Sequence, residues 1–104
     1  IVRILLTIPF HESLNKLPLS ERRRSRSYLQ LLHAWIKGVQ DENDISNIPY
    51  SNFYITFEQE ISQQQYNMKL RIYLVQVEGF RLFITVSGSL SPVCKFVYID
   101  NITP

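Results

Sequence analysis

Four arginines stand close together near the start of the segment LSERRRSRSYLQLLHAWIKG, residues 19–38: they are Arg22, Arg23, Arg24 and Arg26. The spacing of apolar residues in this segment predicts an amphipathic helix. The N-terminus of a helix carries the positive end of its dipole, so each exposed cation there costs roughly 0.3–1 kcal/mol. Arginines at so unfavourable a place are candidates for binding an anionic partner.

On a helical wheel Arg22, Arg26 and Lys37 lie on one side of this helix with His33, opposite the apolar residues. The acidic residues that follow the helix lie roughly 25 Å from Arg22 along the helix axis, too far to neutralise it. The predicted partner is a nucleic-acid phosphate backbone or an acidic protein surface. The residues predicted to contact it are Arg22, Arg23, Arg26 and Lys37.

The alternative is a solvated helix face whose arginines form ion pairs within the chain, for which Glu58 and Glu60 are candidates. A regulatory hypothesis also arises, because Ser25 and Ser27 each follow an arginine by three residues, the pattern that basophilic kinases favour. The wheel turns Ser25 towards the core, which argues against its access to a kinase.

Residues able to perform catalysis are few and poorly arranged. His11, Glu12 and Ser13 are adjacent in PFHES, whereas the partners of a catalytic triad converge from separate segments. Cys94 shares its register with apolar neighbours and is expected in the core, where a thiol is inert. His33 has no second metal ligand at helical spacing. We therefore predict no enzymatic activity, no cofactor, no metal site and no small-molecule substrate.

The composition is that of one globular domain spanning residues 1–104. A net charge of +2 is too mild for bulk charge to identify a nucleic-acid or membrane binder. One cysteine excludes an internal disulfide and weakly favours an intracellular compartment. No segment predicts a membrane span or a signal peptide. The chain begins with Ile1, which leads us to expect a domain of a longer protein.

The N-terminal half predicts one strand and one helix. Residues 1–8 alternate in polarity like a half-buried strand that ends at Pro9, and residues 10–18 are expected to form a loop. Ser20 is the expected N-cap of the helix and Gly38 its end. Its apolar stripe consists of Tyr28, Leu29, Leu32, Trp35, Ile36 and Val39. The polar segment that follows predicts a surface connection.

From residue 52 the apolar pattern repeats every second residue, which predicts four strands. The residues that share one face of these strands are Phe53, Ile55 and Phe57, then Met68, Leu70, Ile72 and Leu74, then Phe80, Leu82, Ile84 and Val86, and finally Cys94, Phe96 and Tyr98. The connections SQQQYN, EG and SGSLSP have hairpin length. We predict an α+β fold with an N-terminal strand and one amphipathic helix packed on a four-stranded antiparallel meander.

The opposite register of these strands is also apolar, at Tyr73, Val75, Val77, Phe83, Val97 and Ile99. A sheet covered on one side should alternate more cleanly. The N-terminal segment covers this second face, or a protein partner or second copy does, or the sheet curls. The protein interface is predicted at Tyr73, Val75, Phe83 and Val97.

The segment VQVEGFRLFITVSG, residues 75–88, resembles the first hairpin of cystatins, in which a Gln-Val-Val-Ala-Gly loop joins two long strands after a single helix. Gln76, Val77 and Gly79 match that loop, and Glu78 stands where the family has Val-Ala. The resemblance implies a likeness of architecture, and no inhibitory residue is carried over. The strand–helix–strand order also looks like that of several ribosome-associated and double-stranded-RNA-binding domains.

Three functions follow from these observations. The first is a non-enzymatic protein-interaction or assembly module within a larger complex, which binds through the second sheet face or an edge strand. The second is a nucleic-acid-binding domain that uses the basic helix face. The third is a cystatin-like protease inhibitor.

Overall fold

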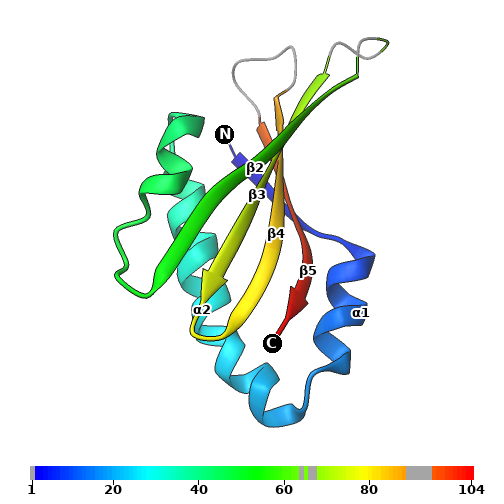
Figure 1. Ribbon diagram of the computed structural model, residues 1–104, viewed down its shortest axis with the longest axis vertical. Helices are drawn as coiled ribbons and strands as arrows, with labels where there is room; N and C mark the ends of the chain where they lie inside the picture. The colour runs from blue at the N-terminus through cyan, green and yellow to red at the C-terminus, as the bar shows by residue number, and fades with distance from the viewer. Residues whose placement is uncertain (1, 64, 66–67, 89–94) are drawn as a thin grey trace.

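The computed structural model describes residues 2–63, 65, 68–88 and 95–104 and confirms the α+β class. Its elements are β1 (Val2–Leu6), α1 (Ile8–Lys16), α2 (Leu19–Gly38), the 3-10 helix η1 (Glu42–Asn47), β2 (Phe53–Gln63), β3 (Met68–Val77), β4 (Phe80–Gly88) and β5 (Lys95–Thr103). The strands form one mostly antiparallel sheet, with α2 packed on one of its faces (Figure 1).

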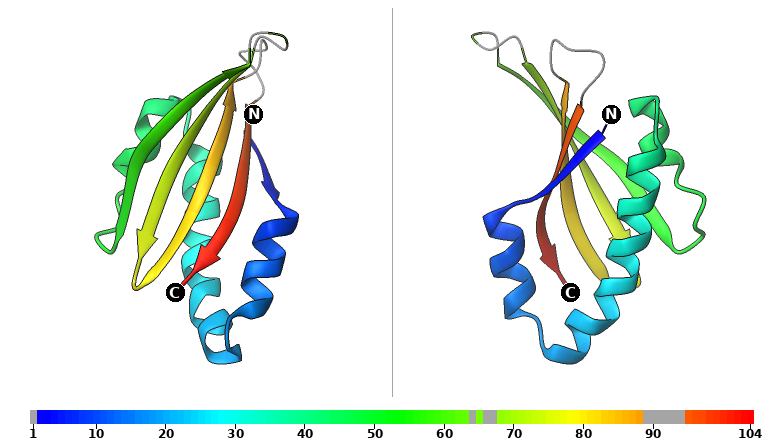
Figure 2. Two further views of the ribbon diagram at one scale, coloured as in Figure 1. Left: turned by 45° about the vertical axis from the view of Figure 1, so that its right-hand side comes forward. Right: turned by 180° about the vertical axis from the view of Figure 1, so that it is seen from behind.

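Strands β2 to β5 form the predicted antiparallel meander, and β1 adds a fifth strand parallel to β5, in the order β1-β5-β4-β3-β2. The predicted strand over residues 1–8 ends two residues early. Leu6 and Ile8 are consequently 47% and 74% exposed, and only Val2 and Ile4 pack partly against the core. The N-terminal strand therefore extends the sheet at its β5 edge and does not cover a face (Figure 2).

The loop predicted over residues 10–18 is wrong, because most of that segment belongs to α1. The hydroxyl of Thr7 accepts a hydrogen bond from the Phe10 backbone N–H at 3.2 Å and so caps the helix. Pro9 lies in the first turn, where the missing N–H would have no helical partner anyway. Pro9 was interpreted only as a strand terminator, although the same residue is favoured at a helix start.

Helix α2 begins two residues earlier than predicted. Its N-cap is Pro18, which has no capping side chain, and Ser20 lies inside the first turn, so the Ser20 cap was wrong. The Pro18 carbonyl accepts the first helical hydrogen bond from the Arg22 N–H at 2.9 Å. The predicted end at Gly38 is confirmed.

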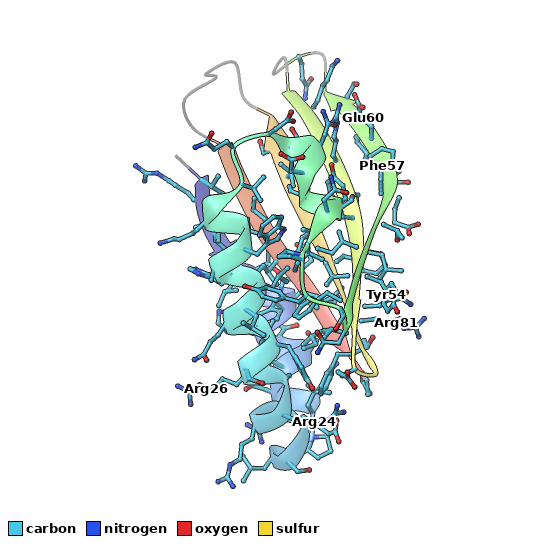
Figure 3. All side chains as sticks on the ribbon, turned by 90° about the vertical axis from the view of Figure 1, so that its left-hand side faces the viewer. Arg24, Arg26, Tyr54, Phe57, Glu60 and Arg81 are labelled. Carbon is cyan, nitrogen blue, oxygen red and sulfur yellow. The ribbon has the colours of Figure 1, made fainter. Side chains whose placement is uncertain are left out.

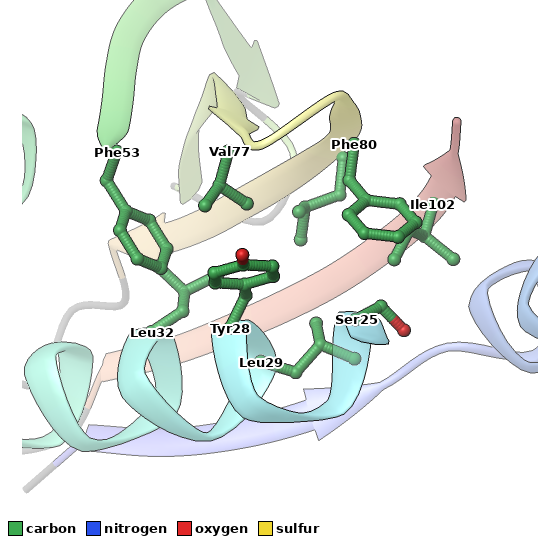
Figure 4. Close-up of a pocket in the computed structure, with 9 residues that line it drawn as sticks. Ser25, Tyr28, Leu29, Leu32, Phe53, Val77, Phe80 and Ile102 are labelled. Carbon is green, nitrogen blue, oxygen red and sulfur yellow. The ribbon is translucent and has the colours of Figure 1, made fainter. Parts of the chain in front are cut away.

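The apolar stripe of α2 is confirmed as its core-facing side. Leu32 and Ile36 are fully buried, the other four predicted residues pack partly against the core, and Ser25 is buried between them. Figure 4 shows Tyr28 and Leu32 facing the sheet residues Phe53 and Phe80. The space between them holds no volume that a water molecule could occupy, so this region is packed core and not a ligand site.

A two-residue turn, Glu78–Gly79, joins β3 to β4. Both residues have positive φ, 46° and 83°, which is the type I′ geometry that matches the twist of a hairpin. The turn pairs Val77 directly with Phe80, and Val75 with Leu82. Directly paired residues share a face of the sheet. The turn length therefore decides which residues of β3 join the buried residues of β4.

The predicted buried face is correct for β4 and for the first part of β2, and it is wrong for β3 and β5. The buried residues of β3 are Tyr73, Val75 and Val77, and those of β5 include Val97 and Ile99. The predicted core residues Leu70, Ile72 and Leu74 lie on the other face, half-buried. Cys94 lies outside the described residues.

Candidate functional site

The two faces of the sheet differ in what covers them. Helix α2 runs along one face, α1 lies against β5, and neither crosses the face that is turned to the viewer in Figure 1. In Figure 3, Tyr54 and Arg81 lie on the side of the sheet opposite α2. We call this side the outer face. Its residues with described side chains on β2, β3 and β4 are Tyr54, Thr56, Gln59, Ile61, Leu70, Ile72, Leu74, Gln76, Arg81, Phe83, Thr85 and Ser87, of which Ser87 is buried.

An apolar band crosses the outer face. Leu74 on β3 lies directly between Thr56 of β2 and Phe83 of β4. Phe83 is 41% exposed, and Tyr54, one row nearer the hairpin turn, is 66% exposed. Rings so exposed on a continuous sheet surface offer a large apolar contact area with few side-chain torsions to restrict.

Beside Phe83 the outer face is hollowed, with a volume of about 480 Å³. Ile72 and Phe83 contribute apolar walls, and Thr85 and Asp100 contribute polar ones. The Thr85 hydroxyl donates to the Asp100 carboxylate at 2.7 Å, which holds that carboxylate in place. The hollow is open to solvent, and a protruding side chain of a partner would fit it better than an enclosed small molecule.

Of the predicted interface residues, only Phe83 lies on the outer face. The other three belong to the core: Tyr73, Val75 and Val97 are 3%, 0% and 2% exposed. Their assignment to an interface was wrong, because it assumed that they lie on an uncovered face of the sheet. Their side chains contact other core residues, and no partner can reach them while the domain stays folded. The register of β3 and β5, which the sequence pattern had reversed, accounts for the error.

Tyr54 and Leu74 are the outer-face residues that the sequence analysis missed as interface candidates. A usable signal existed in the two-residue connection Glu78–Gly79, because it requires Val77 to pair with Phe80. Counting outward from that pair places Leu74 opposite Phe83 on the outer face. Alternation alone carries no such information from Ile72 to Val77, since apolar residues occupy both registers there.

The sheet has two edge strands, β1 and β2. Several features of β2 disfavour strand addition at its edge. A bulge interrupts the pairing between Phe57 and Gln59. Glu58 and Glu60 place exposed carboxylates near the bulge. Bulges and charges are the devices by which proteins prevent edge-to-edge pairing. The outer face is therefore a better candidate for partner contact than this edge.

The predicted basic residues of α2 separate into two groups. Arg22 is half-buried, and its Nε donates to the Leu17 carbonyl at 3.1 Å, so it supports the junction with α1. Arg23, Arg26 and Lys37 are exposed, and no hydrogen bond or ion pair joins them to any residue that the structure describes. In Figure 3, Arg26 projects away from the sheet.

Arg24 is one of the four clustered arginines but was not among the residues predicted to contact a partner, and the structure gives it a structural role. Its Nη2 atom donates to Glu21 at 2.7 Å, and its Nη1 atom donates to the Glu78 carbonyl at 2.8 Å. The guanidinium also lies 4.3 Å from the centre of the Phe80 ring. The hydrogen bond with the Glu21 carboxylate raises the pKa of Arg24. Arg24 thus ties the start of α2 to the β3–β4 turn.

The carboxylates proposed to neutralise these arginines have other partners. Glu60 lies 3.6 Å from the Nε of Arg71 and 3.9 Å from the Nζ of Lys69. Arg71 also lies 3.8 Å from Glu42 of η1, whose carboxylate raises the pKa of Arg71. Glu58 accepts a hydrogen bond from the Thr56 hydroxyl. The described side chains of Glu58 and Glu60 therefore form no ion pair with the arginines of α2, and that alternative was wrong.

His11, Glu12 and Ser13 are consecutive residues of α1. The Ser13 hydroxyl donates to the Phe10 carbonyl at 2.9 Å and accepts from the Ile102 N–H at 2.9 Å, which fastens α1 to β5. Both of its hydrogen-bonding functions are engaged by backbone groups. Within the described ranges, no three His, Cys, Asp or Glu side chains gather as a metal site would require.

None of the helices in the described part of the chain is both long and apolar enough to cross a membrane. Comparisons with protein-family models, with curated proteins and with solved structures find no significant match to this chain.

Proposed function

We propose that this domain is a non-enzymatic interaction module that binds a protein partner through the outer face of its sheet. The observation that carries the proposal is the exposure of Tyr54 and Phe83, 66% and 41%, on a face that no described helix covers. Single exposed apolar residues are ordinary on protein surfaces, whereas apolar residues grouped on one face mark interaction sites.

The rest of the outer face supports a protein partner. Leu70, Ile72 and Leu74 are half-buried there, and Ile61 is 39% exposed. An antiparallel sheet whose second face meets only water usually carries polar residues at such positions. A partner that covers these side chains with apolar groups would gain about 25 cal/mol for each Å² removed from water.

The absence of enzymatic activity remains part of the proposal. Ser13, the one hydroxyl in the His11–Glu12–Ser13 run, has both of its hydrogen bonds with backbone groups. A nucleophilic serine needs instead a hydrogen bond to a general base. The arrangement favours a structural role for Ser13.

The test compares two apolar surfaces of similar exposure. One variant carries Tyr54→Ser with Phe83→Ser on the outer face. The control carries Leu31→Ser on α2, because Leu31 is 38% exposed and lies on the opposite side of the molecule. Light scattering across a concentration series measures self-association, and affinity capture with quantitative mass spectrometry measures other partners.

We expect the outer-face variant to weaken association at least tenfold, because buried aromatic anchors typically contribute 2 kcal/mol or more each. The Leu31→Ser control should bind like the parent. The proposal would be wrong if the parent stays monomeric at all concentrations and the outer-face variant captures the same proteins in the same amounts.

A further inference from the structure

The solvent-facing side of α2 has an unusual composition. At 100° per residue, the residues opposite its buried stripe fall within an arc of roughly 120°. We call this arc the α2 outer arc, and its residues are Leu19, Arg23, Arg26, Ser27, Gln30, His33, Ala34 and Lys37. All eight are exposed, and no residue of α2 after Glu21 is acidic.

The charge of the chain is concentrated at one corner. Residues 16–26 hold five Lys or Arg side chains and one acidic side chain, a net charge of +4, whereas the whole chain carries +2. The remaining residues are therefore net negative. This corner is the junction of α1 and α2, which lies at one end of the molecule (Figures 1 and 2). A localised field of this kind attracts an anionic partner although the net charge is small.

The cations of the arc are available for an external partner. Arg23, Arg26 and Lys37 have no hydrogen bond or ion pair with any residue that the structure describes. Arg22 and Arg24, in contrast, contact the Leu17 carbonyl and the β3–β4 turn. At 1.5 Å per residue, Arg23 and Lys37 stand about 21 Å apart along the helix. The basic surface is thus long enough to follow several phosphates of a duplex.

The residues between the cations distinguish among anionic partners. Ser27 and Gln30 are neutral hydrogen-bonding side chains of the kind that contact phosphates beside Arg and Lys. Leu19, at the first residue of the helix and 54% exposed, is the one large apolar residue of the arc, so the arc lacks the continuous apolar face that inserts into a membrane surface. It also lacks the aromatic residues and methionine that are enriched in protein–protein interfaces. These features favour a nucleic-acid backbone over a lipid headgroup layer or an acidic protein.

From this composition and geometry we infer that the α2 outer arc is a second binding site, for the phosphate backbone of a nucleic-acid duplex. Arg23, Arg26 and Lys37 contact phosphates, and Ser27 and Gln30 lie between them. The site is separate from the outer face of the sheet, since α2 packs on the opposite face (Figure 3). Binding through phosphates carries no base specificity, and its affinity falls steeply with salt.

The test uses fluorescence anisotropy with two random-sequence duplexes, one of DNA and one of RNA. Each has about 20 base pairs, roughly twice the length of α2. The arc variant carries Arg23→Gln, Arg26→Gln and Lys37→Gln. The control variant has the same net charge and carries Arg3→Gln, Lys69→Gln and Arg81→Gln, none of which lies on α2. A thermal melt establishes that each variant is folded.

We expect the parent to bind at low salt. In the arc variant, the slope of log K against log salt concentration should fall by about 3, roughly one for each phosphate contact removed. The control variant should retain the parent slope. Equal affinity for the two duplexes would indicate backbone charge alone, and tighter binding to RNA would indicate recognition of the A-form groove or the 2′-hydroxyl. Both outcomes support the site.

Three outcomes would overturn the inference. The parent could bind neither duplex at low salt. The control variant could lose as much affinity as the arc variant, which would indicate bulk charge. Polyglutamate or anionic vesicles could bind through the arc while duplexes do not, which would assign it to an acidic protein or a membrane surface. If the triple variant does not fold, Gln30→Glu places one negative charge mid-arc and should weaken duplex binding severalfold.

If duplex binding fails, the proposed protein interface on the outer face of the sheet is unaffected, because the two sites use different residues. We accordingly expect Phe83→Ser to leave duplex binding unchanged.

Discussion

Phe80 and Phe83 are the same residue type on the same strand, three positions apart, and they are 1% and 41% exposed. An odd spacing along a strand turns two side chains to opposite faces of the sheet. Phe80 packs beside the ring of Tyr28 and beneath the guanidinium of Arg24. Phe83 faces outwards beside Leu74. Apolar residues are therefore present on both faces of the sheet, and coverage by α2 decides which of them stabilise the fold.

The largest expected effect tests the comparison on β3. Val75→Lys places a charge at a site with 0% exposure on the inner face, and we expect it to cost more than about 4 kcal/mol and to unfold much of the protein. Leu74→Lys, on the outer face, should cost about 1 kcal/mol because the side chain can extend into water. Urea denaturation monitored by circular dichroism measures both changes. A larger loss of stability in Leu74→Lys than in Val75→Lys would instead support the register that the sequence pattern suggested, with Leu74 in the core.

The phenylalanine pair gives the next effect. Phe80→Ala should lower the free energy of unfolding by about 3–5 kcal/mol, because it opens a cavity between α2 and the sheet. Phe83→Ala should lower it by about 1–2 kcal/mol, since part of that ring already contacts water. Both losses follow from the shift of the denaturant midpoint, provided that the free energy of unfolding falls with denaturant concentration at the same slope in each variant. Equal losses would mean that the outer face is as well covered as the inner one.

A smaller effect is expected at the turn that sets the register. Glu78 adopts φ = 46°, a left-handed conformation that is costly for a residue with a long side chain. Glu78→Asn should stabilise the domain by about 0.5–1 kcal/mol, because Asn followed by Gly79 is a favoured type I′ pair. A rise in the melting temperature is the readout. No rise, or a fall, would mean that the turn does not have this geometry in solution.

The smallest difference is expected between two neighbouring arginines of α2. Arg24→Gln removes the contacts with Glu21, the Glu78 carbonyl and the Phe80 ring, so we expect a lower melting temperature. Arg26→Gln removes no described contact and should leave the melting temperature unchanged or slightly higher, because it relieves repulsion with Arg22. Differential scanning calorimetry resolves the two. A destabilising Arg26→Gln would assign Arg26 a structural role and weaken the case for the α2 outer arc.

Periodicity in the sequence was sufficient for the order of the main elements. The stripe from Tyr28 to Val39 predicted α2 and its buried side, and the alternation after residue 52 predicted the meander. It was insufficient for α1, since Pro9 and Thr7 support a helix start as well as a strand end. Local patterns with two physical meanings are resolved only by what the segment packs against, which for α1 is β5.

The candidate sites were harder to predict than the fold. The exposed positions of Phe83, Arg23, Arg26 and Lys37 agree with the sequence pattern, and their roles in binding stay predictions. Tyr73, Val75 and Val97 were assigned to the wrong face. The basic segment likewise gave no sign that Arg24 crosses to a turn more than fifty residues away in sequence.

The sequence by itself determined the α+β class, the meander and the buried stripe of α2, because these depend on the local periodicities of 3.6 and 2 residues. Only the tertiary structure decided which face of the sheet is covered, where β1 pairs, and which arginines are held inside the fold. From Ile72 to Val77 both registers of β3 carry apolar residues, so the free energy of burial there differs between them only once α2 covers one face. That choice depends on contacts between residues distant in sequence, which no local pattern encodes.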